Sequence, residues 1–321
     1  MGAALRSQVY ALLTVMLWST AYVFTKLALE FFSPGALGLL RCGVATLTFG
    51  CVVALGRIPA PRLRDLPLFI LSGLCGFTLY MLAFNLGSVT LNPTTNCIVI
   101  STTPIITAVL ARLAFGEKLR ALRWCALALA FGGVVVMNGG GQSFVVAPGI
   151  AWVLLAALLV SLYNILQRGL SRKYGALQIT AWSFFTGTAL LLYFLPDALD
   201  QVRVAPARAL LLLCFLGVFP SAAAYLCWGK ALSLAPRTSL VTNYMFLTPF
   251  LALLLEYMVT GGLPGLSTFV GGGIILASLL LFTLAGGARG GPGGATSAAD
   301  DVYCASLTGC TYFSKRLPFH W

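Results

Sequence analysis

QVYALLTVMLWSTAYVFTKLAL, residues 8–29, is apolar except for its first glutamine, one lysine and a few hydroxyls, and a helix of this length crosses the hydrocarbon core of a bilayer. Nine further apolar segments of similar length follow, separated by short stretches that contain Pro, Gly, Arg or Lys. They lie at about residues 34–55, 66–88, 92–115, 120–138, 148–170, 177–196, 208–233, 237–260 and 264–285. Backbone polar groups in lipid must be satisfied within the segment itself, so helices are predicted. The sequence therefore predicts an all-α polytopic membrane protein with ten transmembrane helices.

The composition excludes a water-soluble protein. Of the 321 residues, 59% are hydrophobic and only 9% are charged, which leaves too little polar side chain to cover a soluble surface. The formal net charge of +12 is accounted for by loops that face anionic lipid headgroups. The lipid bilayer is therefore an expected partner, and nucleic acid is not.

The Lys and Arg residues indicate the orientation, because positively charged loops stay in the cytoplasm. With the N-terminus inside, 16 of them fall on the inner side and only Lys26, Arg203 and Arg208 on the outer side, while Arg41 lies within a span. Both termini are therefore predicted to be cytoplasmic, in a bacterial inner membrane.

Nothing in the sequence favours catalysis or a bound cofactor. The only histidine is His320, the nine cysteines form no CxxC pair, and no phosphate-binding glycine-rich loop is present. We expect neither an enzyme nor a metal site or cofactor. A channel or a non-transporting membrane sensor is the alternative from another class.

Short motifs recur in the same order in both halves of the chain, two of them at an offset of 145 residues. The matching sets are Gly35-Ala36-Leu37 with Gly175-Ala176-Leu177, Tyr80 with Tyr225, Thr103-Pro104 with Thr248-Pro249, and Gly132-Gly133 with Gly271 to Gly273. Five spans per half give the halves opposite orientations, which is typical of inverted-repeat secondary transporters. A duplication retained only for packing is the alternative.

The repeat divides the chain into three predicted regions. Residues 1–139 form the first repeat and residues 140–285 the second. Residues 286–321 open with GGARGGPGG and are predicted to be a disordered cytoplasmic tail.

Several motifs resemble the EamA-type domain of the drug/metabolite transporter superfamily. They are Leu17-Trp18-Ser19 followed by Lys26, Ser33-Pro34 followed by Arg41, Thr103-Pro104 to Gly116-Glu117, and Pro220 to Trp228 leading to Thr248-Pro249. The resemblance implies two inverted five-helix repeats, with the first four helices of each around a central cavity. It also implies the movement of small metabolites, often amino acids or drug-like compounds and frequently outward. In the second repeat the sequence has Gly261-Gly262 where the family often has Gly-Glu, and its acid is Glu256.

Ionisable side chains inside a span are costly, so they mark candidate functional groups. Lys26, Arg41 and Glu256 are predicted to lie in one layer of the outer half and to act in gating or coupling. The alternative is that Lys26 reaches the interface and pairs with Glu30 while Arg41 and Glu256 lock helices together.

A second set of polar and aromatic residues is predicted to line a cavity for a small amphipathic molecule. The candidate substrate-binding residues are Trp18, Tyr22, Arg41, Tyr80, Asn96, Tyr163, Asn164, Tyr225 and Trp228. Hydrogen bonding between helices would explain the same residue types. Pro104, Pro220 and Pro249 are candidate hinges.

These observations together predict an alternating-access secondary transporter that exports amino acids or related amphipathic compounds. A nucleotide-sugar or phosphate-ester exchanger of the same superfamily is the alternative, although it would need more basic residues in the cavity than Arg41. The expected partner is a small-molecule substrate, and homodimerisation is left open.

Overall fold

The described part of the chain is all-helical. The computed structural model describes residues 3–115, 121–137, 148–235, 241 and 243–287, and no strand occurs among them. The helices of the first half are α1 (Ala3–Ala28), α2 (Pro34–Leu55), α3 (Leu66–Gly73), α4 (Tyr80–Thr90), α5 (Pro93–Ile100), α6 (Thr103–Phe115) and α7 (Ala121–Met137). Those of the second half are α8 (Pro148–Leu170), α9 (Ala176–Leu191), α10 (Leu195–Val204), α11 (Ala207–Val218), α12 (Ala224–Leu234), α14 (Thr248–Thr260) and α15 (Leu266–Gly287). Short π or 3-10 segments join some of them: η1 (Leu63–Asp65), η2 (Leu74–Leu79), η3 (Leu192–Phe194), η4 (Phe219–Ala223) and η5 (Asn243–Leu247).

Eight helical stretches in the described part are long and apolar enough to cross a membrane, and two more, Ala121–Met137 and Tyr244–Thr260, are apolar but shorter. Each falls within or overlaps a predicted segment, so the prediction of an all-α polytopic membrane protein is confirmed. The tail prediction concerns residues 286–321, most of which lie outside the described residues.

Local sequence signals set several helix ends. The Ser33 side chain caps α2 by accepting a hydrogen bond from the Ala36 N–H, with Pro34 as the first helical residue. Asn92 caps α5 in the same way, since its Oδ1 accepts from the Thr95 N–H at 2.8 Å. Helix α14 ends where Gly261 adopts a φ of 68°, a left-handed conformation that favours glycine. These caps place the α1–α2 and α4–α5 turns.

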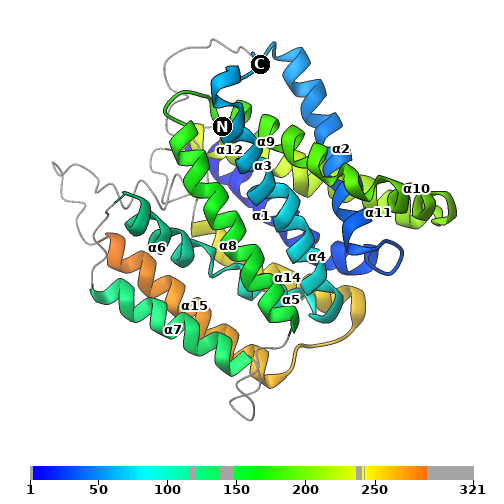
Figure 1. The fold of residues 1–321 in the computed structure, drawn as a ribbon. Helices are drawn as coiled ribbons and strands as arrows, with labels where there is room; N and C mark the ends of the chain where they lie inside the picture. Colours follow the sequence, from blue (N-terminus) through cyan, green and yellow to red (C-terminus); the bar gives the residue numbers. More distant parts are fainter. Residues whose placement is uncertain (1–2, 116–120, 138–147, 236–240, 242, 288–321) are drawn as a thin grey trace.

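Helix α10 is an element that the sequence analysis did not predict. It follows η3 and lies at the edge of the molecule (Figure 1). Asp197 on α10 accepts a hydrogen bond from the Ser33 hydroxyl at 2.5 Å, and Gln201 accepts from the Ser33 N–H at 2.8 Å. Its many polar residues kept it outside the apolar spans, but they give it a face that can lie in water.

The two halves contact each other in reciprocal pairs. Helix α1 packs along α12 while α8 packs along α4, and α1 packs on α14 while α8 packs on α6. Likewise, α3 packs on α9 and α11 on α2. Such reciprocity arises when two similar units are related by a two-fold axis.

One pair of hydrogen bonds repeats this reciprocity at atomic detail. The Ser19 hydroxyl donates to the carbonyl of Val15 in its own helix and to the carbonyl of Thr248, the first residue of α14. In the other half, the Ser161 hydroxyl donates to its own helix and to the carbonyl of Thr103, the first residue of α6. The sequence offset between Thr103 and Thr248 is therefore matched by equivalent contacts.

Corresponding helices of the two halves also meet each other directly. The Thr46 and Thr188 hydroxyls are 2.7 Å apart between α2 and α9. Helices α7 and α15 run side by side (Figure 1), and Gly133 and Gly271 lie at their contact. These contacts are expected where a two-fold axis passes between the halves.

Both halves interrupt the α-helical pattern at equivalent places. The π-helical segments η2 and η4 begin at Leu74 and Phe219, and they lead into the helices that carry Tyr80 and Tyr225. Pro220, one of the predicted hinges, lies in η4. Single-turn π segments often occur at functional sites, and both of these precede helices that position aromatic residues.

Replacing Gly271 by Ala should separate α7 from α15. An added Cβ would lie 2.7 Å from the Met137 backbone N and would also collide with the Gly133 carbonyl. We expect a loss of about 1–3 kcal/mol in stability, as for other overpacked contacts. Gly273→Ala is the matched control because nothing lies within 4 Å of its added Cβ. Thermal unfolding in detergent should show a lower midpoint for Gly271→Ala only, and equal midpoints would contradict the close contact.

Candidate functional site

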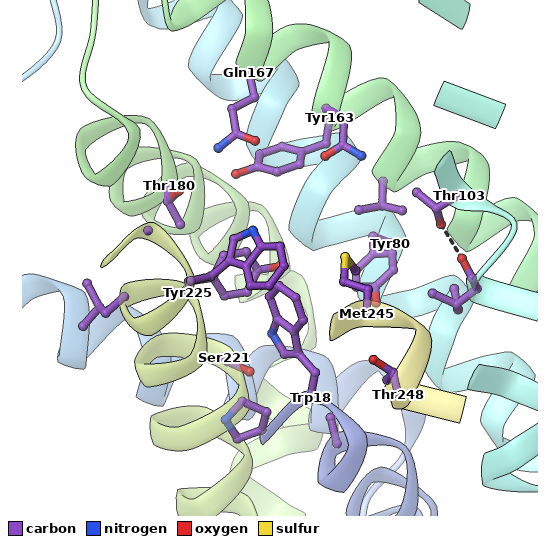
Figure 2. Close-up of a pocket in the computed structure, with 18 of the residues that line it drawn as sticks. Trp18, Tyr80, Thr103, Tyr163, Gln167, Thr180, Ser221, Tyr225, Met245 and Thr248 are labelled. Atoms are coloured by element: carbon purple, nitrogen blue, oxygen red, sulfur yellow. Dashed lines mark hydrogen bonds between the residues drawn. The ribbon is translucent and has the colours of Figure 1, made fainter. Parts of the chain in front are cut away.

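A cavity of about 380 Å³ lies between the two halves. The helices α1, α2, α4, α5, α6, α8, α9, α12 and α14 line it, together with residues of η4 and η5, whereas α7 and α15 contribute none of the described lining. Trp18, Tyr80, Tyr163 and Tyr225 converge on it from four helices (Figure 2). Its size suits a small organic molecule.

Eight of the nine predicted substrate-binding residues line this cavity. They are Trp18, Tyr22, Arg41, Tyr80, Tyr163, Asn164, Tyr225 and Trp228. The structure brings them together from segments up to 210 residues apart in the chain. Whether they bind a substrate stays a prediction.

Asn96 is the exception. Its side chain is 1% exposed, and its Nδ2 donates a hydrogen bond to the Ser88 hydroxyl at 2.5 Å, so it faces α4 rather than the cavity. The polar residues of Asn92–Asn96 stabilise the α4–α5 turn instead, where Asn92 is the N-cap of α5.

Aromatic rings form much of the cavity wall. The Trp18 ring contacts the Tyr225 ring edge to face, with centroids 5.6 Å apart, and lies 5.3 Å from the Trp228 ring. On the other side, the Tyr80 ring stacks against Phe84 at 5.7 Å. Such rings provide apolar contact area with little loss of side-chain entropy, as an amphipathic ligand requires.

Arg41 is the one buried cation of the cavity among the described residues. Its side chain is 6% exposed, and its Nε donates to the Ser221 hydroxyl at 2.7 Å while its Nη1 donates to the Thr25 hydroxyl at 3.2 Å. Neither partner carries a charge, and no described carboxylate pairs with the guanidinium. A buried charge without a counter-charge is costly, so Arg41 is suited to receive an anion.

The predicted Lys26, Arg41 and Glu256 cluster is not joined by ion pairs in this structure. The Lys26 Nζ donates to the carbonyls of Ser88 and Val89 at 2.9 and 2.7 Å. Instead, Lys26 and Glu256 each bind backbone groups at the end of a neighbouring helix. Lys26 binds the C-terminal end of α4, where free carbonyls attract a cation.

Glu256 occupies the complementary position on the same turn. Its Oε2 accepts hydrogen bonds from the N–H and the hydroxyl of Thr94, at 2.8 and 2.5 Å, in the first turn of α5. Free N–H groups at a helix N-terminus favour a carboxylate. The α4–α5 turn is therefore held by a cation from α1 and an anion from α14.

The cavity extends toward one end of the bundle. Its lining includes Gln167 near the end of α8, Ala176 at the start of α9, and Lys230 near the end of α12. Lys26 and Glu256 lie near the other end of the bundle, in the last turns of α1 and α14. Neither residue is part of the lining. The Arg41 end is thus the closed end of the cavity.

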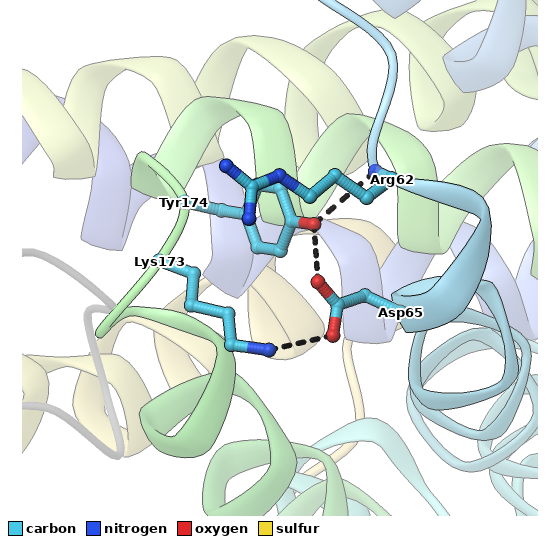
Figure 3. A network of polar contacts seen from close by, with 4 residues as sticks. All are labelled: Arg62, Asp65, Lys173 and Tyr174. Atoms are coloured by element: carbon cyan, nitrogen blue, oxygen red, sulfur yellow. Dashed lines mark hydrogen bonds and ion pairs between the residues drawn. The ribbon is translucent and has the colours of Figure 1, made fainter.

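A polar network joins the two halves at the end to which the cavity extends (Figure 3). Asp65 of η1 forms an ion pair with Lys173 at 2.7 Å and accepts a hydrogen bond from the Tyr174 hydroxyl at 2.6 Å. That hydroxyl in turn accepts from the backbone N–H of Arg62. The network fixes the α2–α3 connection of the first half against the α8–α9 connection of the second.

Some lining residues were not selected from the sequence. Leu177, Thr180 and Phe184 of α9 all line the cavity. Their spacing of three and four residues places them on one helix face, which would have identified them once a single member was known. Ser221 was missed because a small hydroxyl within an apolar run is equally expected in packing.

Cysteine accessibility should distinguish the two buried asparagines. In a background that lacks the nine native cysteines, Asn164→Cys should react with a small polar thiol reagent at least about tenfold faster than Asn96→Cys. Their exposed fractions are similarly low, 6% and 1%, but only Asn164 lines the cavity. Equally slow reaction of both would mean that water does not fill the cavity near Asn164, and equally fast reaction would mean that Asn96 is also reached.

Comparisons with known proteins point to one family. The model of the EamA-like transporter family matches residues 5–139 and 147–284. A probable terminal-alkyne amino-acid exporter of Streptantibioticus cattleyicolor is 29% identical, covering 86% of this chain and 93% of its own. The uncharacterized transporter YdfC of Bacillus subtilis is 28% identical over 81% of this chain and 85% of its own. One crystal structure resembles the fold with a TM-score of 0.58 at 20% identity, over 87% of this chain and 97% of that chain.

Proposed function

The chain belongs to the EamA-like transporter family, and from this premise we propose that it is an alternating-access secondary transporter that exports amino acids or related amphipathic metabolites. The observation that carries the proposal is the aromatic cavity between the halves, with Arg41 buried in its wall without a carboxylate partner. The name of the Streptantibioticus relative, which mentions an amino-acid exporter, is consistent with this substrate class.

We propose that the halves, residues 1–139 and 140–285, are inverted repeats of five transmembrane helices each. The reciprocal contacts between the halves support a two-fold relation. An odd number of spans per half would invert the second relative to the first. The distribution of Lys and Arg supports cytoplasmic termini and a bacterial inner membrane.

With this orientation, the cavity extends toward the cytoplasmic end, and the conformation is one that can load a substrate from the cytoplasm. The hydrogen bonds of Lys26 and Glu256 to the α4–α5 turn keep the outer end closed. Alternating access would require these contacts to break while the cytoplasmic end closes. Export of a cytoplasmic metabolite fits this arrangement.

The alternative of a phosphate-ester exchanger is less well supported. A phosphate dianion is usually bound by several basic side chains. In the described lining Arg41 is buried and Lys230 is exposed at the opposite end. One buried guanidinium suits a single carboxylate better.

The proposed function is tested by flux in proteoliposomes that contain the full-length protein. A panel of radiolabelled metabolites should include at least one whose uptake saturates with concentration and exceeds that of protein-free liposomes. Flux that rises linearly with concentration would indicate a channel, and no flux in the panel would argue against transport of such compounds.

A further inference from the structure

Acidic side chains are absent from the described wall of the cavity. The sequence has only eight acidic residues. Of these, Glu117, Asp300 and Asp301 lie outside the described residues. The other five all lie away from the cavity: Glu30, Asp65, Asp197, Asp200 and Glu256. Each is accounted for, since Glu30 is exposed and the other four have hydrogen-bond or ion-pair partners elsewhere.

The charges that line the cavity have one sign. Arg41 is buried at the closed end, and Lys230 is exposed near the end of α12. In a site of low dielectric constant, the buried charge of Arg41 attracts an anion and repels a cation, whereas water and salt screen the exposed charge of Lys230. The described wall therefore offers a negatively charged group a partner of opposite charge, but it offers a positively charged group only neutral hydrogen-bond acceptors.

Arg41 can accept a further ligand. A guanidinium has five N–H donors, and the bonds to Ser221 and Thr25 use two of them. The described residues provide no carboxylate for the others, and the side chain lines the cavity while 6% exposed. A ligand carboxylate could therefore form the paired hydrogen bonds that an arginine favours.

The remaining polar groups of the wall are neutral. The Tyr163 and Thr248 hydroxyls are buried without a hydrogen-bond partner among the described residues, and both residues line the cavity. They suit a neutral polar substituent such as an amide or a carbonyl. An ammonium group could contact an aromatic face, but such contacts are weaker than the cost of desolvating a cation that has no counter-charge.

We propose that the cavity selects compounds that carry a carboxylate and an apolar or aromatic body but no free ammonium group, so that N-acylated or deaminated relatives of an amino acid bind more tightly than the amino acid itself. This proposal rests on the proposed transport function. The carboxylate binds Arg41, the body lies among the aromatic rings, and an acyl amide is placed to use the Tyr163 or Thr248 hydroxyl.

Four compounds with the same phenyl body separate the contributions of the two charges. These are 3-phenylpropionate, N-acetylphenylalanine, phenylalanine and phenethylamine, which carry an anion, an anion with an amide, both charges, and a cation. Binding to the purified full-length protein is followed by tryptophan fluorescence, since Trp18 and Trp228 line the cavity. We expect the first two to bind at least about tenfold more tightly than phenylalanine and phenethylamine not to bind.

Variants tie the preference to Arg41. Arg41→Ala should remove the difference between 3-phenylpropionate and phenethylamine, and Arg41→Lys, which keeps the charge, should retain part of it. Arg203→Ala, which removes an exposed charge paired with Asp200, should bind as the wild type does. Tighter binding of phenylalanine than of N-acetylphenylalanine, binding of phenethylamine, or no binding by any of the four would overturn the proposal.

The flux experiment distinguishes failure of this proposal from failure of the proposed function. Saturable transport of phenylalanine that 3-phenylpropionate does not inhibit would overturn the selectivity proposed here and leave the transport function standing. Saturable transport of 3-phenylpropionate that exceeds that of phenylalanine would support both.

Discussion

Arg41→Ala is expected to abolish saturable transport while the protein remains folded in the membrane. Removing the guanidinium deprives the cavity of its buried cation and leaves Ser221 and Thr25 without the donor that each hydroxyl accepts from. Losing one member of a buried charged pair typically costs 2–5 kcal/mol of binding, which corresponds to a fall in affinity of roughly 30-fold or more. The measurement is the concentration dependence of uptake into proteoliposomes.

Two further variants make the result specific. Arg41→Lys keeps the positive charge but not the planar fork, so it should transport with a weakened affinity. Arg203→Ala removes a charge of the same kind from the exposed surface of α10 and should leave uptake unchanged. Normal uptake by Arg41→Ala would contradict a role for this residue in binding the substrate.

The overall fold was largely predictable because the bilayer imposes a simple rule on each span. Length and continuous hydrophobicity are enough to predict a membrane helix, and proline or glycine marks many of the ends. Two of the recurring sequence motifs, Thr103-Pro104 and Thr248-Pro249, open helices α6 and α14, while the inverted repeat itself stays a proposal. The π segments η2 and η4 were not predicted, because no local residue pattern distinguishes them from the α-helix that surrounds them.

The cavity residues were predicted with more success than the partners of the charged side chains. Large aromatic and amide side chains within spans identified Trp18, Tyr163 and Asn164, but the same signal also selected Asn96, which faces α4. The contacts of Lys26 and Glu256 depend on which helix ends lie beside them. That information is absent from spacing along one helix, so the sequence placed these charges in one layer but did not identify the α4–α5 turn as their partner.

The contacts of Lys26 and Glu256 with the α4–α5 turn link the charges of these residues to the closure of the proposed outer end. Glu256 is held at the start of α5 by two donors of Thr94, and Lys26 is held at the end of α4 by two carbonyls. Protonation of the Glu256 carboxyl would remove the negative charge that the helix N-terminus favours and would weaken the link between α14 and α5. For a proton to be exchanged for substrate, the carboxyl takes up a proton from the outer side in the outward-open conformation and releases it toward the cytoplasmic side when Glu256 returns to Thr94, where the helix N-terminus favours the carboxylate.

Glu256→Gln should therefore lose proton-driven accumulation but retain the exchange of substrate between two loaded compartments. The neutral amide still accepts a hydrogen bond from Thr94, so the turn can close, but a proton gradient no longer changes its charge. The two activities are measured in the same proteoliposomes, with and without an imposed pH difference. Glu30→Gln is the matched control because Glu30 is an exposed acid in the turn that follows α1 and lies outside this contact. The proposed coupling requires a group at position 256 that can gain and lose a proton. Accumulation that survives Glu256→Gln would therefore exclude Glu256 as the coupling residue. The contact with Thr94 would then be only a structural helix cap.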